Sequence, residues 1–271
     1  MGFDLFAVRS LLFLPASNPR AIAKARDSAA DLVILDLEDA VKEADKDSAR
    51  AAAAEAVRGG WPMPVAIRIN AAGTRWHGED LKAVAESRPD VLVVPKVERS
   101  EDIVAARQAS DDPIIAMVET ARGVLQAGEI ASARDSRLVG LLAGTNDLRA
   151  ELNVPSDAPR ASIAMALQAI VIAARAGGVA VFDGVFNRLE DADGFAAECK
   201  EARALGFDGK CLIHPNQIET CNRIFSPTNE DLDRARRVID AASGGAERFE
   251  GEMIENLHVA AARRLLQRAR R

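Results

Sequence analysis

Eight short apolar segments alternate with alanine-rich segments along most of the chain, and this alternation restricts the fold more than any other feature. Each apolar segment is continuous, which is typical of strands that are buried on both faces. We expect strands at Val8–Leu14, Leu32–Asp36, Pro64–Ile69, Val91–Lys96, Ile114–Glu119, Leu138–Ala143, Val179–Asp183 and Lys210–His214.

Amphipathic segments separate the expected strands. We expect helices at Pro19–Ala30, Ser48–Arg58, Gly78–Ser87, Ser100–Ala109, Val124–Ala133, Ile163–Ala176 and Asp193–Leu205. Eight strand and helix repeats predict an α/β protein with a single (β/α)8 TIM barrel over residues 1–225, and a chain of 271 residues is long enough for one. An open, doubly wound sheet is the alternative.

Residues 226–271 lie outside the eight repeats. The motif Pro227-Thr228-Asn229-Glu230 predicts a helix at Asp231–Ala242, which a loop at Ser243–Arg248 separates from a last helix that begins near Glu255. We expect this C-terminal helical extension to pack on a neighbouring subunit.

Composition excludes several classes of partner. The net charge of −6 and the pI near 5.3 disfavour nucleic acid and anionic membranes. Three cysteines without metal-ligand spacing indicate neither a disulfide framework nor a zinc cluster. No segment approaches the roughly 20 apolar residues that a membrane span needs. We therefore expect a cytoplasmic protein.

Two acidic residues follow consecutive apolar segments. Glu119 comes directly after Ile114–Val118, and Asp147 comes after Leu138–Ala143 and a Gly-Thr-Asn turn. The carboxyl ends of barrel strands converge on one rim, which carries the catalytic residues of this fold. Because hard cations prefer oxygen ligands, Glu119 and Asp147 are candidate ligands for Mg²⁺ or Mn²⁺. The alternative is that each acid caps the following helix.

Arg68 ends another expected strand. A guanidinium group binds a carboxylate through two hydrogen bonds, so Arg68 is a candidate to hold a 2-oxo or dicarboxylic acid. It can also form a structural salt bridge with Asp36 or Glu38. The acids of Leu35–Val41 can orient Arg68 and metal-bound waters, and Glu38 is a candidate for a direct catalytic role.

Two interpretations of the chemical role are open for each of Lys96 and His214. Lys96 can form a Schiff base, although a buried barrel lysine paired with acids is the commoner arrangement. His214 can act as an acid or base near neutral pH, although a rim residue that shapes a substrate loop fits its setting better. The sequence contains no Walker motif and no strand-linked Gly-x-Gly-x-x-Gly, which disfavours a P-loop or a classical NAD site.

Several motifs together resemble the citrate lyase beta-subunit family, which is grouped with the malyl-CoA and citramalyl-CoA lyases and the HpcH/HpaI aldolases. The resemblance extends in order from Arg9 to about Ala242. The motifs that carry it are Arg9–Pro15, Leu35–Val41, Arg68–Asn70, Pro95–Glu98, Glu119–Gly123, Gly206–Lys210, Ile213–Ile218 and Phe225–Pro227.

The resemblance implies a TIM barrel, commonly trimeric, that uses Mg²⁺ to cleave or form a carbon–carbon bond beside a thioester. It implies that Glu119 and Asp147 bind the metal and that Arg68 binds the carboxylate of the acid. It also implies that a CoA or acyl-carrier thioester arm enters along loops near Arg9 and Ser10 and along the segment from His214 to Pro227.

Three positions depart from the family pattern. The family segment Gly-x-Met-Ile-Asp-x-Pro, whose Asp acts as acid or base in a neighbouring subunit's site, here ends in Glu255-Asn256-Leu257. Asn146 stands where Glu is frequent, and His77 stands where an apolar residue is usual. Glu255 keeps a carboxylate but adds a methylene, and a misplacement of about 1 Å can lower a rate about 100-fold.

We therefore expect a magnesium-dependent carbon–carbon lyase or thioesterase that acts on a 3-hydroxy-dicarboxylyl thioester, such as malyl-CoA, citramalyl-CoA or a citryl thioester. One alternative is an aldolase for a free 2-oxo-4-hydroxy acid. Another is a barrel that binds metal and ligand without turnover and serves as a partner subunit, and the Glu255 replacement motivates it.

Overall fold

Eight parallel strands close into a barrel in the computed structural model, which describes residues 3–133 and 137–269. The strands are β1 (Ser10–Pro15), β2 (Leu32–Asp36), β3 (Val65–Arg68), β4 (Val91–Val94), β5 (Ile114–Val118), β6 (Leu138–Ala143), β7 (Ala180–Asp183) and β8 (Gly209–Leu212). Each strand pairs with its neighbour in sequence, and β8 pairs with β1. The predicted TIM barrel is confirmed, and the doubly wound alternative is excluded.

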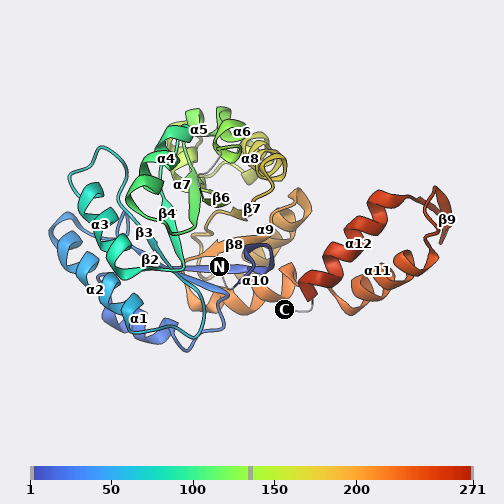
Figure 1. Cartoon of the computed structure of the whole chain (residues 1–271), viewed down its shortest axis with the longest axis horizontal. Coiled ribbons are helices and arrows are strands. Elements are labelled where there is room, and N and C mark those ends of the chain that lie inside the picture. Colours follow the sequence, from blue (N-terminus) through green and yellow to red (C-terminus); the bar gives the residue numbers. More distant parts are fainter. Residues whose placement is uncertain (1–2, 134–136, 270–271) are drawn as a thin grey trace. The chain divides into compact units, whose positions relative to one another are not determined.

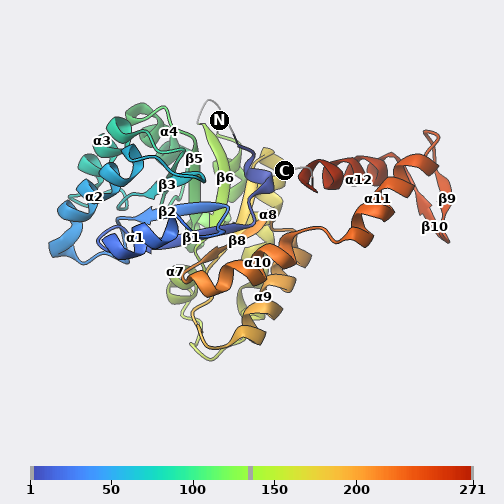
Figure 2. The same cartoon turned by 90° about the horizontal axis from the view of Figure 1, so that it is seen from below.

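Helices surround the strands on the outside of the barrel (Figures 1 and 2). They are α1 (Pro19–Ala25), α2 (Lys46–Arg58), α3 (His77–Ser87), α4 (Ser100–Ala109), α5 (Ala121–Leu125), α6 (Ala127–Ala131), α7 (Thr145–Glu151), α8 (Ala164–Gly177) and α9 (Ala192–Leu205). The single helix expected at Val124–Ala133 is two short helices, because the backbone leaves helical geometry at Gln126. Helix α7 was not expected.

The barrel interior is apolar along most of its length. Alternate residues of the strands point inward, and they form one cluster that includes Leu11, Ile34, Ala66, Val93, Ile115, Met117, Leu142, Phe182 and Cys211. Two positions after Ile34, Ala66 and Met117 come Asp36, Arg68 and Glu119. Because side chains alternate with a period of two along a strand, the same inward face becomes charged at the carboxyl ends of β2, β3 and β5.

Helix α8 has a composition that is also compatible with a lipid environment. Among the described residues, Arg160–Gly177 is the single helical stretch whose length and apolar content match those of a membrane span. Helix α8 packs against β6 and β7. Burial against the barrel accounts for its apolar face, as in any helix that covers a sheet.

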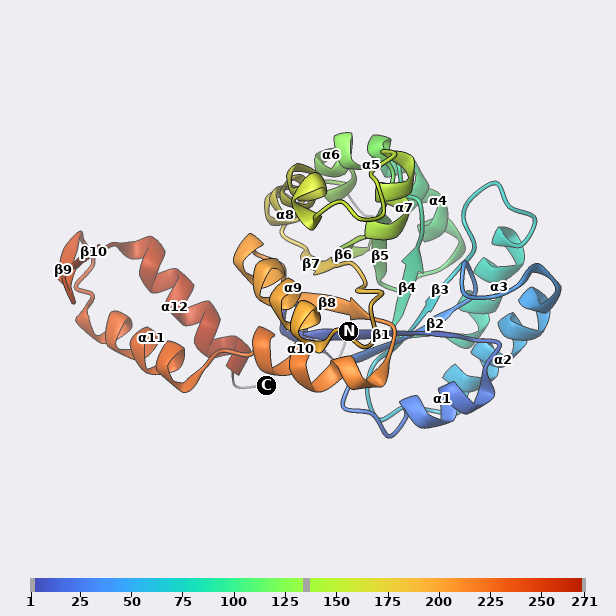
Figure 3. The same cartoon turned by 180° about the vertical axis from the view of Figure 1, so that it is seen from behind.

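The chain divides into two compact units, residues 1–222 and 223–271, and the division falls inside α10 (Ile218–Phe225). The sequence predicts a boundary at residue 226, which lies three residues after the start of the second unit. The second unit contains α11 (Asn229–Ala241), β9 (Glu247–Phe249), β10 (Glu252–Ile254) and α12 (Asn256–Ala269). Its two helices pack together around Ala235, Val238, Ile254, Val259 and Ala262 (Figure 3).

A hairpin occupies part of the region in which we expected a loop. Strands β9 and β10 pair antiparallel, and the turn between them is Glu250-Gly251, with φ of +50° and +87°. Two successive residues with positive φ match the twist of a two-residue hairpin. The turn sequence Glu-Gly is not one of the residue pairs, such as Asn-Gly or Asp-Gly, that predict a two-residue hairpin, so only its glycine was a partial signal in the sequence.

Candidate active site

A cavity of about 290 Å³ opens at the carboxyl ends of the strands. Its walls come from β1, β2, β3, β5, β6 and β8, from the start of α7 and from the segment that follows β7. The lining residues include Phe13, Asp36, Asp39, Arg68, Met117, Glu119, Asn146, Asp147, Asn187 and Ile213. The structure therefore brings Arg68, Glu119 and Asp147 together on the rim that carries catalysis in this fold.

Glu119 lies directly after β5 and is almost completely buried. Its Oε1 accepts a 2.7 Å hydrogen bond from the backbone N–H of Lys96. Its Oε2 is buried and accepts no hydrogen bond among the described residues. Burial, together with the charges of Glu38 and Asp147, raises the pKa of Glu119 to about 8. A buried carboxylate oxygen without a donor is an incomplete site, and a cation would complete it.

Asp147 is the third residue of α7, so a whole turn of helix rather than the strand itself positions it. Its side chain is 37% exposed, and its Oδ1 lies 3.7 Å from Nζ of Lys96. No cap hydrogen bond from Asp147 starts α7, whose N-cap residue is Gly144. The alternative interpretation of Asp147 as a helix cap is therefore wrong.

The charges around the cavity favour a divalent cation. Five carboxylates surround the two cations Arg68 and Lys96, and they belong to Asp36, Glu38, Asp39, Glu119 and Asp147. If all are ionised, the formal balance is −3. No cluster of three or more ligating side chains occurs among the described residues. Two carboxylates, completed by water and substrate oxygens, are the usual protein share of a magnesium site.

Arg68 is held by Asp36. Nε and Nη2 of Arg68 donate to Oδ1 and Oδ2 of Asp36, both at 2.6 Å, and Nη1 lies 2.9 Å from Oε2 of Glu38. Burial alone would lower the pKa of Arg68, but these acids outweigh it and raise the pKa. The structural salt bridge that we considered is present. It also fixes the guanidinium plane at the cavity wall, where Arg68 can still meet a carboxylate.

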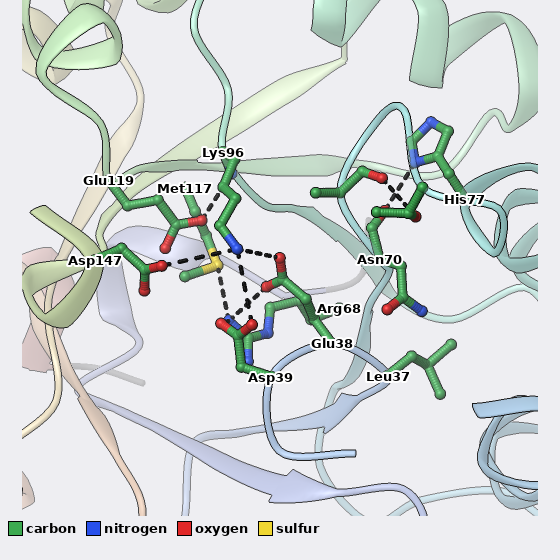
Figure 4. A network of polar contacts seen from close by, with 12 residues as sticks. Leu37, Glu38, Asp39, Arg68, Asn70, His77, Lys96, Met117, Glu119 and Asp147 are labelled. Atoms are coloured by element: carbon green, nitrogen blue, oxygen red, sulfur yellow. Dashed lines mark hydrogen bonds and ion pairs between the residues drawn. The ribbon is translucent and has the colours of Figure 1, made fainter. Parts of the chain in front are cut away.

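Lys96 links four acids, as Figure 4 shows. Its Nζ donates to Oε1 of Glu38 at 2.9 Å and lies 3.7 Å from Asp39 and from Asp147. Burial would lower the pKa of Lys96, but the hydrogen bond to Glu38 and the acidic neighbours raise it. A Schiff base needs a neutral amine, so this environment is opposite to the one that a covalent lysine requires.

A buried network that the sequence did not reveal holds the loop after β2. Nζ of Lys46 donates to the carbonyl oxygens of Leu37 and Glu38 and to Oδ1 of Asn70, at 2.8, 2.7 and 2.6 Å. Nδ2 of Asn70 in turn donates to Asp80. Nothing in its sequence context distinguishes Lys46 from a solvated helix residue, so only the fold shows this role.

Arg9 and Ser10 lie at the opposite end of the barrel. They are at the amino end of β1, where Arg9 binds Asp31 through two 2.8 Å hydrogen bonds and the backbone N–H of Asp31 donates to Oγ of Ser10. A strand of six residues separates this end from the catalytic rim. The expectation that Arg9 and Ser10 bind substrate is corrected accordingly: their motif supports the barrel.

His214 lies on the catalytic rim, where β8 ends. It is the N-cap residue of a short 3-10 helix, and its Nδ1 accepts a hydrogen bond from the backbone N–H of Asn216. A groove of about 370 Å³ runs between this segment and α1, and it is lined by His214, Arg20 and Lys24 among others. The position of His214 fits a residue that shapes a binding groove.

The three positions that depart from the family pattern lie in different surroundings. Asn146 exchanges amide hydrogen bonds with Asn187 at the cavity wall. His77 begins α3 and places Nδ1 2.8 Å from the carbonyl oxygen of Asn70. Glu255 is exposed in the second unit, just before α12, and its backbone N–H donates to His258. Its expected role in a neighbouring subunit stays a prediction.

Comparison with known proteins places this geometry in a family. The HpcH/HpaI aldolase/citrate lyase family matches residues 9–215. A (3S)-malyl-CoA thioesterase of Cereibacter sphaeroides is 42% identical over 99% of this chain and 97% of the relative. Citrate lyase subunit beta of Leuconostoc mesenteroides subsp. cremoris is 34% identical over 96% of this chain and 93% of the relative.

A solved structure is similar over nearly the whole chain. It is protein CitE of Mycobacterium tuberculosis in complex with magnesium, acetoacetate and coenzyme A, which is 36% identical. The TM-score is 0.84, and the match covers 98% of this chain and 100% of that protein.

Proposed function

Because the chain belongs to the HpcH/HpaI aldolase/citrate lyase family and is an enzyme of the CoA-ester lyase type, we propose that it cleaves a 3-hydroxy-dicarboxylyl-CoA thioester of the malyl-CoA type with Mg²⁺. The observation that carries this proposal is the meeting of Arg68, Glu119 and Asp147 in one cavity. Arg68 could bind the free carboxylate of the substrate, while a metal ion on Glu119 and Asp147 could bind the oxygens near its thioester.

Hydrolysis of the thioester is the preferred reaction, since the malyl-CoA thioesterase relative matches almost the entire chain. Carbon–carbon cleavage is the second candidate, because the citrate lyase beta subunit is also similar over most of its length. The two reactions share the binding of the acid and differ in which bond of the acyl group breaks.

The residues of this chain act on the substrate in defined ways. Arg68, fixed by Asp36, holds the free carboxylate of the acyl group and so orients the reacting carbon atoms. Glu119 and Asp147 hold Mg²⁺, which supplies Lewis-acid polarisation of a substrate oxygen when bound. The backbone N–H of Lys96 keeps Glu119 in position.

Glu38, which is buried against Arg68 and Lys96, is the residue that we propose for proton transfer. Burial raises the pKa of Glu38, while Arg68 and the hydrogen bond from Lys96 act in the opposite direction. A carboxylate with a raised pKa exchanges protons more readily near neutral pH. In hydrolysis it would take one proton from the water whose oxygen bonds to the thioester carbonyl carbon. It would then return that proton to the CoA sulfur as the carbon–sulfur bond breaks, so that the products are the free acid and the CoA thiol.

The thioester arm is proposed to lie in the groove between α1 and the His214 segment. Arg20 and Lys24 line this groove and could pair with the phosphates of coenzyme A. A homo-oligomer, with a trimer favoured, and a cytoplasmic location complete the proposal. An oligomer is needed if Glu255 is to reach a neighbouring subunit's site.

A panel of malyl-CoA, citramalyl-CoA and citryl-CoA tests the function. Each thioester is assayed with and without Mg²⁺ for free CoA, and separately for the 2-oxo acid that carbon–carbon cleavage releases. We expect release of CoA that Mg²⁺ stimulates and that Glu119→Gln and Asp147→Asn each abolish. Normal turnover in either variant, or turnover of free 2-oxo-4-hydroxy acids alone, would overturn the proposal.

A further inference from the structure

Lys96 occupies an unusual position at the centre of the acid cluster. Its backbone φ is +50°, a left-handed conformation that is unfavourable for a residue with a side chain. This turn follows β4 and directs both the backbone N–H and the side chain toward the acidic side chains of the network in Figure 4. The N–H binds Glu119, and the ammonium lies between Glu38 and Asp147.

The backbone N–H of Lys96 contacts one proposed metal ligand, and its side-chain ammonium contacts the other. The hydrogen bond to Glu119 involves Oε1 and leaves the buried Oε2 without a donor. The ammonium lies 3.7 Å from Oδ1 of Asp147, which is a charge contact rather than a hydrogen bond. Lys96 therefore fixes one ligand firmly and attracts the other weakly.

We propose that Lys96 is the internal counterion of the metal-free site, which attracts Asp147 until a divalent cation replaces it there. The inference rests on the proposed metal site. The ammonium of Lys96 also donates a hydrogen bond to Oε1 of Glu38. It keeps this partner after Asp147 turns to the metal. The proposal needs no change in the left-handed backbone of Lys96 or in its N–H bond to Glu119.

This arrangement has a measurable consequence. The ammonium of Lys96 repels an incoming metal ion, and the metal ion has to displace it from Asp147. Lys96 therefore weakens metal binding. In the metal-free protein the same ammonium reduces the repulsion among the carboxylates. Removing its charge while keeping a polar side chain of similar length should therefore strengthen metal binding. Unit charges at this separation still interact measurably in water, so an effect of at least about threefold on the dissociation constant is expected.

Electron paramagnetic resonance of free Mn²⁺, with Mg²⁺ as competitor and no substrate, measures this affinity without turnover. The variants are Lys96→Gln, which loses the charge, and Lys96→Arg, which keeps it. Lys82→Met is the matched control, because it removes one positive charge at an exposed position paired with Glu79. We expect Lys96→Gln to lower the Mn²⁺ dissociation constant at least about threefold, and the other two variants to bind as the wild type does.

The outcomes separate the inference from the function. Equal or weaker Mn²⁺ binding by a folded Lys96→Gln variant would show that Lys96 only supports Glu38, and would overturn the inference while the metal site stands. Absence of any Mn²⁺ or Mg²⁺ binding by the wild-type protein would overturn both. If Lys96→Gln does not fold, Lys96→Met is titrated in its place under the same criterion, and if neither folds, Lys96 is a structural residue and the inference is wrong.

Discussion

Gly144 lies directly against the side chain of Glu119. A Cβ atom added at position 144 would overlap both the carboxylate and the Cβ of Glu119. The loop after β6 thus closes on the acid that follows β5, and the absence of a side chain at Gly144 is what lets the carboxylate reach the cavity. The backbone φ of Gly144 is −85°, so space rather than conformation requires glycine here.

Gly144→Ala should therefore displace the Glu119 carboxylate. We expect metal affinity to fall at least about tenfold and kcat/KM about 100-fold, because an error of about 1 Å in a catalytic group has effects of that size. Mn²⁺ titration and the CoA-release assay measure the two quantities. Gly128→Ala, where an added methyl group enters open space among the described residues, is the matched control and should change neither. Unchanged metal affinity in Gly144→Ala would contradict the close fit.

Arg68→Lys keeps the positive charge but loses the planar fork that binds Asp36 through two hydrogen bonds. We expect kcat/KM to fall about 10²- to 10³-fold, mainly through KM, because the substrate carboxylate loses its oriented partner. Arg175→Lys removes a similar fork to Asp208, which does not line the cavity. It should lower the melting temperature and leave KM within about twofold. Equal changes of KM in the two variants would contradict a role of Arg68 in binding the substrate carboxylate.

The sequence predicted the barrel because its evidence is local and repeated. Every expected strand overlaps an observed one, since continuous apolar segments report burial on both faces directly. Glu119 and Arg68 were predictable for a related reason. Each lies two positions after an inward-facing apolar residue of its strand, so its side chain points to the same side. Their convergence follows from the parallel barrel alone.

The errors and omissions have two causes, and the first is that a motif does not state which end of a strand faces the site. Arg9 precedes β1 and Ser10 is its first residue, so both lie at the end of the strand that is far from the cavity. Lys46 and the left-handed turn at Lys96 act through partners distant in sequence. Such contacts leave no periodicity, and no single segment predicts them.

Lys46→Met should destabilise the protein and loosen the Glu38 loop together. The substitution leaves three buried acceptors without the ammonium that they share, which should cost about 2–4 kcal/mol of unfolding free energy. Urea denaturation measures this cost, and the CoA-release assay should show a lower kcat. Lys42→Met, at an exposed position four residues earlier, should change neither quantity. A loss below about 0.5 kcal/mol would show that the network is dispensable.

Glu255 offers a test of subunit cooperation. If its carboxylate acts in a neighbouring subunit's site, then Glu255→Ala and Glu119→Gln should each be inactive, yet hybrid oligomers of the two variants should regain part of the wild-type rate. Glu255→Asp introduces the residue that the resemblance implies at this position and should be at least as active as the wild type. Inactive hybrids, or an active Glu255→Ala, would remove Glu255 from the proposed mechanism.

The raised pKa of Glu119 ties stability and metal binding to pH. Burial and the neighbouring acids raise its pKa from 4.5 to about 8 in the folded protein. Between these values the metal-free folded state holds a proton that the unfolded state has lost. Unfolding therefore releases a proton, and this contribution to stability is present below pH 4.5 and is lost as the pH rises toward 8.

Mg²⁺ reverses this trend, because a carboxylate ligand binds metal only after it loses its proton. With a pKa of about 8, Glu119 is about 1% ionised at pH 6 and about half ionised at pH 8, so Mg²⁺ affinity should rise up to about fifty-fold over this range. Thermal unfolding with a fixed, non-saturating Mg²⁺ concentration should show a larger rise in Tm at pH 8 than at pH 6. Glu119→Gln should show a small, pH-independent rise. An equal Mg²⁺ effect at both pH values in the wild type would show that Glu119 is already ionised at pH 6.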